Sequence, residues 1–279
     1  MKSLFQAELY RARKSKSPLI ILIVCFGMSL FSGLTYGIMY GNAPWIQKMY
    51  ENAFGYNPFA FGDDLDLGLD IAGLTRMKSV GEFISTGLRI NICLYLVIFI
   101  AVFLMPMRRS GFIKNLSSEH SRTRIFFVHV LLILIYSFLL VDAAALAMAL
   151  MCLVTYRGLP LGGLPELLTY LVTSALLVAA IGLVVLTLTD LLRRQTPAIV
   201  MSVIYLWMIA PTVFAMGQVM TLYTSRSDFR LQYVSLAGNL MLLSPGKWDT
   251  ILSSLLVIAV YAGLCILLHF LVVRKKDII

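Results

Sequence analysis

The stretch RRSGFIKNLSSEHSRTR, residues 108–124, is the largest polar island between two long apolar runs of the chain. Its seventeen residues carry five of the 23 Lys and Arg. Phe112, Ile113 and Leu116 recur at helical spacing in its middle, which predicts a short amphipathic helix with one apolar side. On the basic face of a membrane, such a segment is either a solvated connector or the place where a soluble partner acts.

The composition around this stretch is that of a membrane protein. The chain has 279 residues, of which 59% are hydrophobic and 13% charged, and its mean hydropathy is +0.87. Soluble globular domains are less apolar and more charged, so we predict an all-α integral membrane protein. The net charge of +9 arises from basic residues at the ends of apolar runs, which indicates membrane topology and not a nucleic-acid partner.

Apolar runs of sufficient length predict a single transmembrane domain, residues 1–279, with six spans. Residues 1–17 form an interfacial helix before the first span, and residues 42–84 and 221–249 form external loops. Within the second loop, the apolar stretch 234–243 is too short to cross a bilayer, so it is either re-entrant or lies on the surface. The predicted spans cover about 18–41, 85–106, 125–156, 167–192, 196–220 and 251–273.

An even number of spans places both termini on one side of the membrane. Fifteen of the 23 Lys and Arg lie on that side, so we expect both termini in the cytoplasm. The cysteines, by contrast, all fall inside apolar runs without metal-type pair spacing, so neither a disulfide framework nor a metal site is predicted. They are Cys25, Cys93, Cys152 and Cys265.

Small residues follow one face of the first predicted span at intervals of four. They are Ser29, Gly33, Gly37 and Gly41. Small side chains at this spacing allow the backbone of another helix to approach closely. The partner helix belongs either to this chain or to a second subunit.

Asp142 lies midway along the third predicted span, in SFLLVDAAALAMAL. An ionised group at this depth costs about 2.5–3.5 kcal/mol on insertion scales, so Asp142 should face a protein interior or a wet cavity. It is either a residue of a transport pathway or the partner of a hydrogen bond between spans.

Catalytic motifs are missing from the sequence. It contains no HExxH, no GxSxG and no GxxxxGK[ST]. We therefore expect no catalytic residue, no enzyme activity and no cofactor in this chain, and any ATP chemistry must come from another polypeptide.

Two stretches carry a resemblance to a known family. AELYRARKSKSP (residues 7–18) and SGFIKNLSSEHSRTR (residues 110–124), together with six spans and a long first external loop, resemble the permease subunits of type-2 ABC exporters. The closest group is the bacterial one that serves export of, or immunity to, bacteriocins and other antimicrobial peptides.

The resemblance implies an elbow helix that includes Phe5, Glu8, Leu9 and Arg11. It also implies a cytoplasmic coupling helix that docks on a separate ATPase, with Phe112, Ile113 and Leu116 in a groove of that subunit. The full coupling set is Gly111, Phe112, Ile113, Lys114, Asn115 and Leu116.

The same resemblance implies the partners and the location. Two copies of a soluble ATPase would hold ATP and Mg, and the permease would pair with a second copy or with a related permease. A peptide substrate and the bilayer of a bacterial plasma membrane complete the expected partners, without nucleic acid. Two other functions stay open: a membrane assembly or sensor protein without transport, and an ion-coupled secondary transporter that uses Asp142.

Overall fold

The computed structural model describes residues 2–39, 52, 79–88, 91–105, 122–155, 160, 162–192, 195–209 and 234–273. Helices account for 92% of it, and no strand occurs in these ranges. The prediction of an all-α fold is therefore confirmed.

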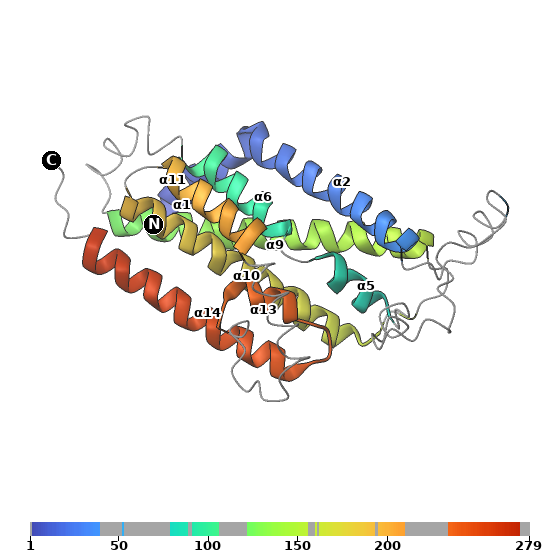
Figure 1. The fold of residues 1–279 in the computed structure, drawn as a ribbon. Coiled ribbons are helices and arrows are strands. Elements are labelled where there is room, and N and C mark those ends of the chain that lie inside the picture. The colour runs from blue at the N-terminus through green and yellow to red at the C-terminus, as the bar shows by residue number, and fades with distance from the viewer. Residues whose placement is uncertain are drawn as a thin grey trace.

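The helices run side by side in a bundle, with α2 along one edge and α14 along the opposite edge (Figure 1). π-Helical segments continue α6, α11 and α14, namely η1 (Ile100–Leu104), η2 (Tyr205–Ile209) and η4 (His269–Val273). The α-helices are α1 (Lys2–Lys14), α2 (Lys16–Met39), α5 (Val80–Gly87), α6 (Asn91–Phe99), α9 (Arg122–Thr155), α10 (Leu164–Leu192), α11 (Gln195–Ile204), α13 (Leu236–Leu242) and α14 (Trp248–Leu268).

Four of the described helices are long and apolar enough to cross a membrane, namely α2, α9, α10 and α14, with η4 extending the last. A fifth span is present if α5 and the α6–η1 helix, which meet at a bend of 50°, count as one. The predicted span 196–220 overlaps α11 and η2, and its part beyond Ile209 lies outside the described residues. The described helices thus account for four or five of the six predicted spans.

The first and third predicted spans, α2 and α9, pack along each other in parallel. Near the start of α2, the hydroxyl of Tyr136 donates to the carbonyl of Pro18 at 2.6 Å, across 118 positions of sequence. Further along, Gly33 lies against Met151, where an added Cβ would be 2.8 Å from the Met151 Cβ. The second pair has the same sequence offset as the first, so the two helices advance in the same direction.

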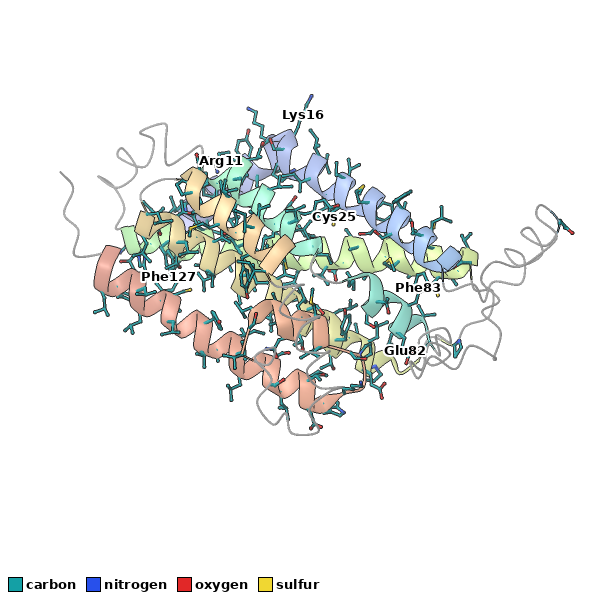
Figure 2. All side chains as sticks on the ribbon, viewed as in Figure 1. Arg11, Lys16, Cys25, Glu82, Phe83 and Phe127 are labelled. Carbon is teal, nitrogen blue, oxygen red and sulfur yellow. The ribbon has the colours of Figure 1, made fainter. Side chains whose placement is uncertain are left out.

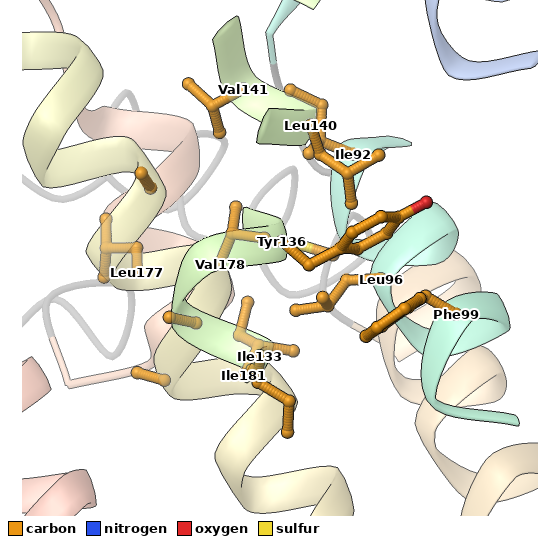
Figure 3. Packing of buried hydrophobic residues seen from close by; sticks show 14 of the residues in the cluster. Ile92, Leu96, Phe99, Ile133, Tyr136, Leu140, Val141, Leu177, Val178 and Ile181 are labelled. Carbon is orange, nitrogen blue, oxygen red and sulfur yellow. The ribbon is translucent and has the colours of Figure 1, made fainter. Parts of the chain in front are cut away.

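The core of the bundle lies around α10. In the most apolar 18-residue stretch of α10, 72% is buried inside the bundle, against 22% of the corresponding stretch of α2. Gly182 permits this packing, because a Cβ there would approach Leu96 Cδ2 to 2.7 Å and Ile133 Cγ2 to 2.8 Å. Figure 3 shows side chains of α6, α9 and α10 turned toward one another at this crossing. Bulky apolar side chains and one glycine therefore bring three helices into close contact.

The turns before α10 and before α14 each contain a glycine with positive φ, Gly162 at 78° and Gly246 at 81°. Glycine adopts this conformation without a Cβ penalty. The backbone N–H of Val80, at the start of α5, donates to the carbonyl of Pro160 at 3.0 Å. The start of α5 is therefore tied to the turn that leads into α10.

The apolar stretch 234–243 includes α13, which packs against α10 and α14. Its Leu236, Ala237 and Leu240 are buried. Asn239 is buried as well, and its side-chain oxygen accepts a hydrogen bond of 3.3 Å from Ser254 of α14. This short helix is therefore a packed element of the bundle.

Candidate functional site

The N-terminal helix α1 packs one side against the beginning of α2 and against α9. Leu4 and Glu8 are each only 4% exposed, and Phe5 and Ala12 are partly buried against the core. Leu9 lies on the exposed side of α1, with 45% of its surface accessible. The first residues thus form a helix, and its docked side is defined by Leu4 and Glu8.

An ion pair lies on the docked side of α1. Nη2 of Arg11 is 3.1 Å from Oε2 of Glu8, one helical turn earlier. Burial raises the pKa of Glu8, and the neighbouring guanidinium acts against that rise. Burial likewise lowers the pKa of Arg11, with the Glu8 carboxylate opposing. Each group therefore offsets part of the cost of burying the other.

Arg11 also reaches the end of the second predicted span. Its Nη2 donates to the carbonyl of Phe103 at 3.3 Å, and its guanidinium carbon lies 4.3 Å from the centre of the Phe103 ring. A cation over an aromatic face at this distance is attracted by the ring quadrupole. Phe103 belongs to η1, and single-turn π-helical segments occur frequently at functional sites.

A series of aromatic contacts continues from Phe103 into the bundle. The Phe103 ring stacks on Phe99 with centroids 5.3 Å apart, and Phe99 stacks on Tyr136 at 3.7 Å. Figure 3 shows Phe99 of α6 and Tyr136 of α9 facing each other. Tyr136 then donates to the carbonyl of Pro18 in the first turn of α2. We call Arg11, Phe103, Phe99, Tyr136 and Pro18 the N-terminal clasp.

Phe103 of the clasp is close in sequence to the polar segment 108–124. Met105 is the last described residue before residues 106–121, and Arg122 is the first one after them. The predicted coupling residues Gly111, Phe112, Ile113, Lys114, Asn115 and Leu116 therefore lie outside the described residues. Before this stretch, the structure describes Phe103 of η1, whose carbonyl accepts a hydrogen bond from Arg11, a residue labelled in Figure 2.

The small-residue face of α2 is used within the chain, at least at Gly33. Met151 and Met148 of α9 cover this glycine, with the Met148 Sδ 3.2 Å from where a Cβ would be. Ser29 is partly buried. Gly37 falls in α2 with its surroundings undescribed, and Gly41 lies outside the described residues. At Gly33, the helix that approaches α2 closely is α9.

Asp142 lies on the exposed side of α9. No hydrogen bond or ion pair joins its carboxyl to the part of the chain that the structure describes. A hydrogen bond between spans was one of the two roles that the sequence leaves open, and the described helices contain no such bond to Asp142. In a single chain, the Asp142 carboxyl therefore faces outward, away from the other helices of the bundle.

Two aromatic residues at the clasp end of the bundle form a contact that the sequence does not suggest. The ring of His269, in η4, stacks on Phe126 of α9 with centroids 3.8 Å apart and an angle of 15°. His269 is 3% exposed. The sequence contains one indication of this burial. His269 lies inside an apolar run, and ionisable side chains within spans are rare and usually face protein.

Comparison with known proteins gave no match: no family model, no curated protein and no solved structure corresponds to this chain. Within the described residues, no group of three or more His, Cys, Asp or Glu is placed to hold a metal ion. The arrangement of the N-terminal clasp suits transmission of a displacement between helices, because its contacts join α1, the continuous α6–η1 helix, α9 and α2.

Proposed function

We propose that this chain is the membrane-spanning permease subunit of an ATP-driven exporter. Its substrate is amphipathic or hydrophobic, with an antimicrobial or toxin-like peptide as the leading candidate, and leaves the cytoplasm or the membrane outward. A separate soluble ATPase, present in two copies, binds ATP and Mg. The chain resides in a bacterial plasma membrane with both termini in the cytoplasm, and pairs with a second permease.

The observation that carries this proposal is the N-terminal clasp at the start of residues 106–121. A partner bound to Phe112 and Leu116 would displace the adjoining end of η1. Because Arg11 holds both the ring and the carbonyl of Phe103, α1 would move with that end. Stacking of Phe99 on Tyr136 would pass the displacement to α9.

The free energy that these contacts contribute agrees with the proposed role. Coupling between two sites in a protein typically amounts to about 1–3 kcal/mol. A partly exposed cation–π contact together with a hydrogen bond from a charged donor contributes about the same amount. The clasp is therefore strong enough to couple a docked partner to the spans, and weak enough to rearrange in each cycle.

The two other functions receive less support. A sensor or assembly protein could use the same clasp, but would not need a partner that hydrolyses ATP. An ion-coupled transporter would need Asp142 inside a pathway, and in the single chain this carboxyl lies on the exposed side of α9. Binding of an ATPase is thus the property that separates the proposals.

The experiment is capture of an ATPase by the purified chain. The native protein, in detergent, is incubated with soluble proteins of its own host, and captured proteins are identified by mass spectrometry and assayed for ATP hydrolysis. We expect the native chain to retain a protein that carries GxxxxGK[ST]. The double variant Phe112→Asp, Leu116→Asp should lose it, because charges at buried interface anchors cost most of the binding energy.

A matched control places the same charges on the polar side of the stretch, in the double variant Ser118→Asp, Ser121→Asp. This variant should keep the partner, and all three proteins should show the same thermal unfolding midpoint. Failure of the native chain to retain any ATPase would overturn the proposal. Equal loss in both variants would remove the predicted docking side.

A further inference from the structure

Asp142 is exceptional among the charged residues of the described spans. Every other Asp, Glu, Lys or Arg in the four candidate spans lies within a few residues of a span end, such as Glu166, Asp190 and Asp249. Asp142 lies at the centre of its span and is exposed. Its carboxyl therefore sits at a depth where lipid offers neither water nor a hydrogen-bond partner.

The residues that share this exposed side define a continuous face along α9. They recur three or four positions apart, the spacing of a helix side that packs on another helix. We call this set the α9 outer face. Its members are Ile135, Leu139, Asp142, Leu146, Leu150 and Leu153.

Other exposed sides of the bundle differ in chemistry. On α2 the exposed large side chains include Ile23, Val24 and Phe31, and on α14 they include Leu256 and Val260. The central parts of these two sides carry no charged residue, so lipid tails can cover them at no electrostatic cost. The α9 outer face alone, within the described spans, needs a polar partner at the middle of the membrane.

We propose that the α9 outer face packs against the α9 outer face of a second copy of this chain. Two copies inserted in the same orientation are related by a two-fold axis along the membrane normal, so each residue on the axis meets its own counterpart. Asp142 then meets Asp142 of the other copy at the same depth. Two adjacent carboxyls cannot both ionise, so they share a proton and form a hydrogen bond between the copies.

The neighbours of Asp142 fit this close approach. Ala143 and Ala149 lie beside the face and are partly buried, and small residues at such positions let helices come close in a membrane. The small-residue side of α2 is an alternative site for pairing, but Met151 of the same chain already covers Gly33. The inference takes up the pairing with a second permease that is part of the proposed function and adds the surface by which two copies meet. It is argued from the position of Asp142 in its span.

Cysteine cross-linking in lipid vesicles tests this contact. The four native cysteines are buried, and a background without them is prepared by replacing each with alanine or serine. Leu139→Cys and Leu146→Cys then place one thiol on the α9 outer face. Val24→Cys and Leu256→Cys serve as matched controls, because these side chains are exposed to 47% and 66% on α2 and α14.

Purified protein in vesicles contains no other protein partner, so a cross-linked species of twice the mass reports a second copy. We expect rapid cross-linking at Leu139→Cys and Leu146→Cys and none at the two control positions. Absence of cross-links on α9, or equal cross-linking at all four positions, would overturn the proposal and leave lipid or a different membrane protein as the cover of Asp142.

A second measurement examines Asp142 itself. Energy transfer between labelled copies, followed as lipid is added, gives the dissociation constant of the dimer. Asp142→Asn should preserve the dimer because two amides also form hydrogen bonds, whereas Asp142→Leu should weaken it about threefold to thirtyfold. A dimer that Asp142→Leu leaves unchanged would show that the carboxyl is not in the contact.

Discussion

Arg11 holds Phe103 in two ways at once, across 92 positions of sequence. Its guanidinium donates to the carbonyl of Phe103 at 3.3 Å and lies 4.3 Å from the centre of its ring. The backbone and the side chain of one residue are thus gripped by a single side chain. The N-terminal helix and the end of η1 cannot separate without losing both contacts.

The first prediction concerns the geometry of this grip. Arg11→Lys keeps the positive charge but removes the planar group that stacks on the ring while donating a hydrogen bond. We expect the free energy of unfolding to fall by about 1–2 kcal/mol. For a chain of this size, that lowers the thermal midpoint by roughly 2–8 °C, measured in detergent.

Arg13→Lys is the matched control, since Arg13 lies two residues further on in α1 and is exposed. Its thermal midpoint should equal that of the native chain within about 1 °C, because exposed charges contribute little. Equal effects of the two variants would show that the docking of α1 does not depend on the contact with Phe103.

The second prediction concerns pH. Burial raises the pKa of Glu8 above its ordinary value of 4.5, while Arg11 stays protonated. Protonated Glu8 therefore favours the docked helix. This stabilisation is complete below pH 4.5 and is lost as the pH rises through the raised pKa. The thermal midpoint of the native chain should fall over that window relative to Glu8→Gln, which cannot titrate.

Glu166→Gln, at an exposed position near the start of α10, provides the comparison. Its pH profile should follow the native one. If Glu8→Gln and the native chain show parallel profiles from pH 4.5 upward, then the carboxyl of Glu8 does not control docking of α1.

The third prediction uses two glycines of α2. A Cβ at Gly33 would lie 2.8 Å from the Met151 Cβ, whereas a Cβ at Gly27 meets nothing within 4 Å. Gly33→Ala should destabilise the protein by about 1–3 kcal/mol, because atoms close to a backbone cannot yield. Gly27→Ala should be neutral or stabilise by up to about 1 kcal/mol, because alanine favours the helix.

Thermal unfolding of the two alanine variants, side by side in one detergent, measures this difference. The effects should have opposite signs or differ clearly in size. A Gly33→Ala variant as stable as Gly27→Ala would mean that α2 and α9 are not in close contact at this position.

The fourth prediction concerns the aromatic part of the clasp. Tyr136→Phe removes the hydrogen bond to Pro18 but keeps the ring on Phe99, and should cost about 1 kcal/mol. A double-mutant cycle of Tyr136→Leu and Phe99→Leu, followed by chemical unfolding, should give a coupling energy of about 0.5–1.5 kcal/mol. Additive effects of the two changes would show that the rings do not interact.

The sequence was sufficient to locate four helices that are long and apolar enough to cross a membrane, because length and hydropathy define such segments. The apolar runs that predicted the first, third, fourth and last spans correspond to α2, α9, α10 and α14. The bend between α5 and α6 was not predicted, because most of α5 (Val80–Gly87) precedes the predicted span 85–106 and was assigned to the first external loop. Hydropathy gives the length of an apolar run and does not indicate a change of helix direction within it.

Contacts between distant segments could not be predicted for a related reason. A span that is apolar on all sides has no periodicity to show which side meets protein, so the exposure of Asp142 could not be read from α9. The pairing of Arg11 with Phe103 joins two residues that no local pattern connects. The aromatic residues of the clasp look like ordinary span residues until the helices are assembled.

The parallel contact of α2 with α9 bears on the biosynthesis of the chain. Pro18 and Tyr136 are 118 positions apart, so the ribosome needs roughly 6–24 s to deliver the second helix after the first. During that interval α2 must remain in the bilayer without its main partner. Its exposed large side chains are apolar and its mean hydropathy is 2.1, so it can remain inserted as an independent helix. α10, by contrast, is inserted when α6 and α9, against which it packs, are already present.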